Sequence, residues 1–226
     1  MLKTWASAGY VVAAPDYPRS NQDAVGGVTF NGGIADTKNQ PADASFVIDQ
    51  VLKDKQLGRI IDAKRIGASG HSLGGITTYG LAYSACCRDK RIKAALPMSG
   101  FGGLVEPIEK YVWDGEPPLL ALHGSSDGMV PYVSDVNTLA WAKPPKFLVT
   151  FIGAGHIVPF LGGETAQAMA LKQSTVDFLD RYLKDDKSAL EKLRTDANVP
   201  GQVTLDDQSG TTGASTATTK PGSKGS

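Results

Sequence analysis

The chain has 226 residues, a length that fits a single α/β domain. Its 23 basic residues balance 23 acidic residues, so charge gives no indication of a nucleic-acid partner. No apolar run reaches about 18 residues, and the sequence therefore predicts no transmembrane helix. The two cysteines, Cys86 and Cys87, are adjacent. Because a bridge between neighbours needs a strained geometry, we expect both to be free thiols.

The first residues predict a helix followed by a strand. Residues 2–8 are typical of a helix that ends at Gly9, and residues 10–14 (Tyr-Val-Val-Ala-Ala) are typical of a strand. Residues 1–6 have neither the basic region nor the apolar core of a signal peptide. We therefore expect the chain to begin inside a fold, with any secretion signal in a preceding segment, and the sequence does not define the compartment.

Helix and strand signals alternate along the rest of the chain. Pro41 stands in the first turn of a helix with one apolar face, and residues 164–183 predict a long amphipathic helix. This alternation predicts an α/β fold with a doubly wound, mostly parallel sheet. Five strands are expected, at residues 10–14, 64–68, 92–97, 119–123 and 146–152.

The chain is expected to form one folded domain followed by two C-terminal parts. The domain covers residues 1–186, and residues 187–207 are interpreted as a C-terminal extension. Residues 208–226 consist mainly of Gly, Ser, Thr, Ala and Lys, with almost no large apolar side chain. Such a segment cannot bury enough surface to offset its ordering entropy, so it is predicted to be a disordered tail.

Residues 70–74 (Gly-His-Ser-Leu-Gly) carry the most informative motif. They follow a strand-like run and precede a helix-like one, which is the context of a nucleophile elbow. In that turn the serine has strained backbone angles, and the flanking glycines let neighbouring elements come close. The pattern therefore predicts Ser72 as a nucleophile at the carboxyl end of the sheet, with the backbone N–H of Leu73 as an oxyanion donor.

An acid and a base follow at the ends of later strands. Asp127 comes shortly after residues 119–123, and His156 follows residues 146–152. Because loops at the carboxyl ends of parallel strands gather in one crevice, these side chains are expected near Ser72. A serine hydroxyl needs a base within hydrogen-bond reach, and the acid orients that base. We expect His156 to be the base and Asp127 the acid.

Other histidines and carboxylates offer weaker alternatives. His71 is expected to face the packing behind the elbow, and His123 is expected to support the loop of the acid. Asp114 and Asp135 are rival carboxylates in less strand-like settings. The three histidines include no H-x-x-x-H pair, and the chain has no C-x-x-C motif, Walker loop or dinucleotide fingerprint. No metal or cofactor is expected.

Four motifs in order carry a resemblance to a known superfamily. They occupy residues 9–16, residues 70–75, residues 123–131 (which begin His-Gly-Ser-Ser-Asp and end Val-Pro) and residues 155–156. Residues 1–185 resemble the α/β-hydrolase superfamily, in particular its dienelactone-hydrolase-like esterases and its cutinase- or polyester-hydrolase-like esterases. The resemblance implies a cysteine nucleophile in dienelactone hydrolases proper, so Ser72 favours the esterase side.

The resemblance also implies an element that precedes residue 1. In that superfamily a strand ending in His-Gly comes before the first helix seen here, and its loop supplies one oxyanion-hole amide. The chain is therefore expected to be an N-terminally truncated hydrolase domain without its first strands, and loss of one oxyanion donor typically costs about 10²–10³ in turnover.

We expect a serine carboxylic-ester hydrolase that acts through an acyl-enzyme on a small-molecule or polymeric ester. The alternatives are a serine peptidase or acyltransferase with the same three residues, and a catalytically impaired protein of the same fold. The sequence does not define an oligomeric state. The candidate pocket residues are apolar: Phe101, Trp113, Met129, Ile157, Val158 and Phe160.

Overall fold

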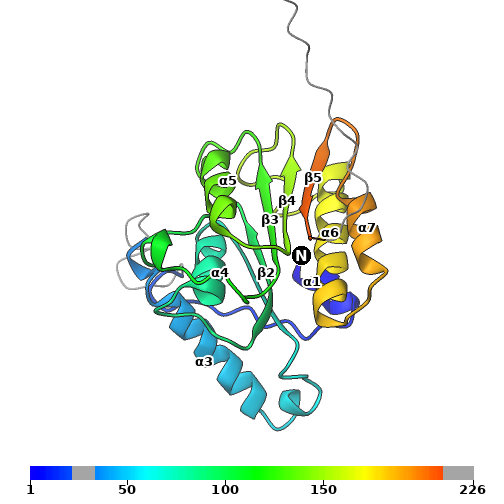
Figure 1. The fold of residues 1–226 in the computed structure, drawn as a ribbon. Helices are drawn as coiled ribbons and strands as arrows, with labels where there is room; N and C mark the ends of the chain where they lie inside the picture. The colour runs from blue at the N-terminus through cyan, green and yellow to red at the C-terminus, as the bar shows by residue number, and fades with distance from the viewer. Residues whose placement is uncertain (22–33, 211–226) are drawn as a thin grey trace, which may run out of the picture.

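The computed structural model describes residues 1–21 and 34–210 and has a five-stranded sheet at its centre (Figure 1). The strand order is β1-β2-β3-β4-β5; β1 to β4 are parallel, and β5 runs antiparallel to β4. The prediction of an α/β fold with a mostly parallel sheet is confirmed. The strands are β1 (Ile66–His71), β2 (Ile92–Met98), β3 (Leu119–Gly124), β4 (Lys146–Phe151) and β5 (Val203–Gln208).

Helices cover both faces of the sheet. In Figure 1, α3, α4 and α5 lie on one side, and α1, α6 and α7 lie on the other. The bounds are α1 (Leu2–Ser7), α3 (Gln40–Lys53), α4 (Leu73–Tyr83), α5 (Tyr132–Trp141), α6 (Ala166–Leu183) and α7 (Ala189–Asp196), with short 3₁₀ turns η1 (Leu57–Arg59) and η2 (Ile108–Lys110). All six residues of β3 are buried, as expected for a parallel strand with helices on both faces.

The core is divided by the sheet into two layers. One layer packs the aromatic residues Trp5, Phe147 and Phe178 between the sheet and α1 and α6. The other contains Tyr79, Tyr83 and leucines between the sheet and α4 and α5. The buried side chains of the central strands therefore pack against helices on both faces of the sheet, which fixes the carboxyl ends of these strands relative to one another.

The predicted strand at residues 10–14 does not form. These residues follow α1 without strand pairing, and an apolar cavity of about 400 Å³ lies between them and β1. Within residues 1–21 and 34–210, no strand pairs with the outer edge of β1. An apolar run becomes a strand only where another strand can accept its backbone hydrogen bonds, and here the cavity intervenes.

The fifth strand lies at the opposite edge of the sheet and was not predicted from the sequence. β5 pairs with β4 along its whole length, from Val203 opposite Phe151 to Gln208 opposite Lys146. α7 packs on α6, and Arg194 of α7 forms an ion pair with Asp207 of β5 at 2.7 Å. Gln208, the first residue of the predicted disordered tail, is the last residue of β5; residues 211–226 lie outside the described residues.

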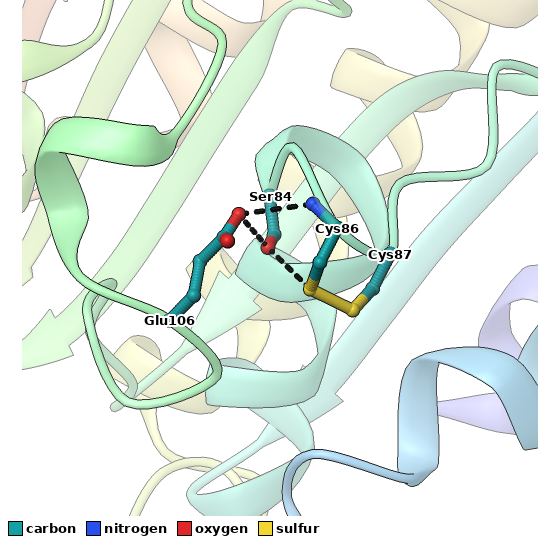
Figure 2. The surroundings of a disulfide bond; sticks show 4 residues. All are labelled: Ser84, Cys86, Cys87 and Glu106. Carbon is teal, nitrogen blue, oxygen red and sulfur yellow. Dashed lines mark hydrogen bonds between the residues drawn. A yellow bond between two sulfur atoms is a disulfide. The ribbon is translucent and has the colours of Figure 1, made fainter.

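Cys86 and Cys87 form a disulfide bond, so the expectation of free thiols is wrong (Figure 2). The reason is the turn after α4, which holds the backbone of the pair. The carboxylate of Glu106 accepts hydrogen bonds from the Cys86 amide at 3.0 Å and from the Ser84 hydroxyl. The amide of Cys87 donates to the Ser84 carbonyl at 3.2 Å, which closes the turn.

Candidate active site

The turn between β1 and α4 holds Ser72 in an unusual backbone conformation. Ser72 has φ 57° and ψ −117° and is the N-cap of α4. Such angles are costly for a non-glycine residue and persist only when the surroundings enforce them. Glycines permit the close approach: a Cβ on Gly70 would lie 2.4 Å from the carbonyl of Gly74, and one on Gly75 would lie 2.8 Å from the carbonyl oxygen of Met98.

Three polar side chains meet where β1, β3 and β4 end. Ser72 Oγ lies 2.8 Å from His156 Nε2, and His156 Nδ1 lies 2.7 Å from Asp127 Oδ2. Because strands β1 to β4 are parallel, the loops after them share one edge of the sheet. Residues that the sequence separates by up to 84 positions are thereby hydrogen-bonded. We call Ser72, His156 and Asp127 the Ser–His–Asp chain.

The carboxylate of Asp127 is held ionised by its surroundings. Burial raises the pKa of Asp127, but hydrogen bonds from His156, from the Val130 amide and from the Met129 amide outweigh burial and hold that pKa below its usual range. Both amides donate to Oδ1 at 2.9 Å, which leaves Oδ2 for His156. A carboxylate only accepts, so His156 Nδ1 carries a proton, and Nε2 is left to accept from the Ser72 hydroxyl.

His71 lies beside the base rather than behind the elbow, so that expectation is wrong. Its Nε2 lies 2.7 Å from the backbone carbonyl oxygen of His156, and the two rings are 4.8 Å apart. The other face of the ring stacks on Phe160 at 5.2 Å. Burial holds the pKa of His71 below its usual range. A neutral His71 donates to that carbonyl and thereby fixes the backbone of the base.

The rival carboxylates do not reach His156. Asp114 is exposed and follows Trp113 in the chain. Asp135 is fully buried and lies 3.0 Å from His123 Nδ1, through its Oδ2. As expected from the sequence, His123 lies at the loop of the acid, where its Nε2 is 2.9 Å from the Val130 carbonyl oxygen. The pairing of His123 with Asp135 was missed, because Asp135 is in α5 and no sequence motif links the two.

The backbone at the start of α4 offers a donor to a negatively charged oxygen. Leu73 is the first residue of α4, and the first amides of a helix have no acceptor within it. The aligned peptide dipoles also place partial positive charge at this end. The predicted oxyanion donor, the Leu73 amide, therefore adjoins Ser72 at the end of the helix that favours negative charge.

The candidate pocket residues divide into two groups. Met129, Ile157 and Val158 are 65%, 49% and 54% exposed and lie within two residues of Asp127 or His156 in the chain. These three apolar side chains are therefore open to solvent beside the Ser–His–Asp chain. The other three are partly or fully buried: Phe101, Trp113, which stacks on Tyr83 at the far end of α4, and Phe160, which packs against His71 and Phe151.

Two other kinds of site are absent from the described part of the chain. Within residues 1–21 and 34–210, no three histidine, cysteine, aspartate or glutamate side chains are grouped so that they could hold a metal ion. In the same part of the chain, no helix combines the length and the apolar character needed to cross a bilayer.

The chain is similar over part of its length to a fungal esterase. It is 31% identical over 109 residues to a probable feruloyl esterase C of Aspergillus clavatus. The match covers 47% of this chain and 37% of that protein, so the chain spans just over a third of its relative's length. No protein-family model matches the sequence.

Proposed function

We propose that the protein is a serine carboxylic-ester hydrolase that acts through an acyl-enzyme. The observation that carries this proposal is the hydrogen-bonded Ser–His–Asp chain at the carboxyl ends of parallel strands. The similarity to a probable feruloyl esterase supports the same class of reaction. Fold alone would not justify the proposal, because one fold serves many chemistries.

In the proposed reaction His156 Nε2 takes the proton of the Ser72 hydroxyl while Oγ attacks the ester carbonyl. The carbonyl oxygen becomes negatively charged and accepts a hydrogen bond from the Leu73 amide. His156 then returns the proton to the leaving alkoxide, and the acyl group stays on Ser72. Water, deprotonated by His156, attacks the acyl-enzyme, and the carboxylic acid leaves as Ser72 regains its proton. Asp127 holds the imidazole in the required tautomer throughout.

The proposed substrate is an ester with an apolar acyl group. Met129, Ile157 and Val158 flank the site and would contact that group, because burial of apolar surface on binding is favourable. Because the relative is a probable feruloyl esterase, a feruloyl ester is the natural probe beside a short aliphatic ester.

The test measures hydrolysis of p-nitrophenyl butyrate and methyl ferulate by the chain and by its Ser72→Ala variant. We expect turnover that the substitution reduces by at least about 10³, because the nucleophile is lost. Thr175→Val serves as a matched control, since Thr175 Oγ1 accepts a hydrogen bond from Trp5 in α1 and lies outside the site. A folded wild-type chain with no turnover above that of the Ser72→Ala variant would contradict the proposal.

A further inference from the structure

A second histidine–carboxylate pair lies directly behind the Ser–His–Asp chain. His123 and Asp135 are both fully buried, and Tyr79 donates its hydroxyl hydrogen bond to Asp135 Oδ1. The three residues come from β3, α5 and α4, the last of which begins next to Ser72. We call Tyr79, Asp135 and His123 the buried support. A fully buried polar cluster of this kind stabilises the fold only when each of its polar groups has a hydrogen-bond partner.

The hydrogen-bond partners of His123 define its protons. A carbonyl oxygen only accepts, so Nε2 must carry a proton toward the Val130 carbonyl at 2.9 Å. Burial raises the pKa of Asp135, whereas the hydrogen bonds from His123 and Tyr79 oppose that rise and favour the carboxylate. As a carboxylate, Asp135 accepts from Tyr79 at one oxygen and from His123 Nδ1 at the other. With Asp135 as a carboxylate, both ring nitrogens donate and His123 is an imidazolium.

The charges around His123 agree with that protonation. Burial lowers the pKa of His123, but Asp135, the Val130 carbonyl and Asp127 outweigh burial and hold that pKa above its usual range. Among the described residues, the titratable groups beside the ring include Asp135, Asp127 and, edge-on at 5.7 Å, Tyr132, and His71 also interacts with it electrostatically. The cation is thus placed between two carboxylates.

His123 also contacts the turn that holds the acid. Its Nε2 lies 3.4 Å from Asp127 Oδ2, the oxygen that accepts from His156. Val130 connects the two groups, because its carbonyl accepts from His123 and its amide donates to Asp127. Movement of His123 would therefore displace Val130 and, with it, the Asp127 carboxylate.

We propose that the imidazolium of His123, held by Asp135 and Tyr79, positions the Asp127 carboxylate and moderates its charge toward His156. This inference rests on the proposed function. His123 acts here as a positioning residue, since it touches neither substrate nor Ser72. The arrangement sets the charge that Asp127 presents at the Ser–His–Asp chain, and so the pH below which hydrolysis declines.

The first test is the pH profile of kcat/KM for ester hydrolysis in wild type, His123→Gln and Asp135→Asn. Glutamine keeps a donor near the Val130 carbonyl but removes the charge; asparagine removes the counter-ion of His123. Both variants lose the cation beside Asp127, so the negative charge of that carboxylate is no longer moderated. We expect the acid limb to move to higher pH by about half a unit or more in both variants. Thr175→Val loses a hydrogen bond outside the site and so controls for lost stability; it should leave the acid limb of the profile at its wild-type pH.

The second test needs no turnover. Imidazole ¹H–¹⁵N NMR spectra of the wild-type chain at pH 7 should show protons on both nitrogens of His123, and Asp135→Asn should remove one of them. His123→Gln should make the Nδ1 proton of His156 exchange faster with water, because its acceptor is held less firmly. A singly protonated His123 in wild type would overturn the inference whatever the activity.

The two proposals can fail separately. Unchanged hydrolysis by Ser72→Ala refutes the proposed function, while the NMR spectra still decide the protonation of His123 and the hold on Asp127. Conversely, Ser72-dependent hydrolysis with an unmoved acid limb in both His123→Gln and Asp135→Asn refutes the inference and leaves the function standing.

Discussion

The protein contains two histidine–aspartate pairs a few ångströms apart, and they differ in what meets the second ring nitrogen. In the pair of His156 and Asp127, the nitrogen far from the carboxylate meets the Ser72 hydroxyl at 2.8 Å. In the pair of His123 and Asp135, it meets the Val130 carbonyl at 2.9 Å. A hydroxyl can give its hydrogen to that nitrogen, whereas a carbonyl can only take one.

This difference separates a candidate base from a positioning group. His156 keeps an unprotonated nitrogen directed at a hydroxyl, so it can accept a proton during a reaction. In the proposed protonation state His123 has both nitrogens committed as donors, and it is sealed from solvent, so it has no site for a substrate proton. The same two residue types therefore perform different tasks because a donor, the Ser72 hydroxyl, meets one ring and an acceptor, the Val130 carbonyl, meets the other.

The largest expected effect separates the two histidines. His156→Ala should lower kcat for p-nitrophenyl butyrate by at least about 10⁴, because the ring nitrogen that meets the Ser72 hydroxyl is lost. His123→Gln should lower it by about tenfold or less, since the donor to the Val130 carbonyl is retained. Steady-state kinetics at high pH measures both. Equal losses in the two variants would erase the distinction drawn here.

A second comparison concerns the two carboxylates. Asp127→Asn should lower kcat by about 10⁴, because an amide can donate to Nδ1 and so favours the wrong tautomer of His156. Asp135→Asn should leave kcat at high pH within about tenfold of wild type, since its effect passes through His123. The measurement is kcat at saturating substrate. If Asp135→Asn proved as damaging as Asp127→Asn, Asp135 would have to act more directly than its contacts indicate.

The smallest expected effect is on stability. Because folding raises the pKa of His123, the folded state binds a proton that the unfolded chain releases above about pH 6.5. This contribution is complete below that pH and is lost as pH rises through the folded pKa, with a slope of at most about 1.4 kcal/mol per pH unit.

The free energy of unfolding in urea, measured between pH 6 and 9, checks this sign. Its decline with pH should be shallower in Asp135→Asn than in wild type, because His123 no longer holds the extra proton. Thr175→Val should lower the whole curve and keep the wild-type slope. Parallel curves for wild type and Asp135→Asn would show that His123 gains no proton on folding.

Much of the fold could be predicted from local pattern. Strands β1 to β4 are short apolar or glycine-bounded runs, and α6 has a clear amphipathic period, so periodicity is sufficient for them. β5 has no such signal: of its six residues only Val203 is buried, because an edge strand has one neighbour. Residues 10–14 show the opposite case, in which an apolar run lacks a pairing partner.

The site, like the fold, could be predicted only where the sequence carries a local signal. Ser72, Asp127 and His156 could be proposed together because each follows a strand, and parallel strands bring such loops to one edge. The partners of His123 could not, since Tyr79 and Asp135 belong to helices whose mutual orientation no local pattern encodes. His71 was misplaced for a related reason, as its contact is the backbone of a residue 85 positions away.

The most direct test of the account is to identify the residue that becomes acylated. The chain would be treated with a fluorophosphonate, which labels activated serines, digested with trypsin and analysed by fragment mass spectrometry. We predict one label, on Ser72 in the peptide between Arg65 and Arg88, and none in Ser72→Ala or His156→Ala. A folded chain that hydrolyses esters but carries its label elsewhere, or carries none on Ser72, would contradict the central claim.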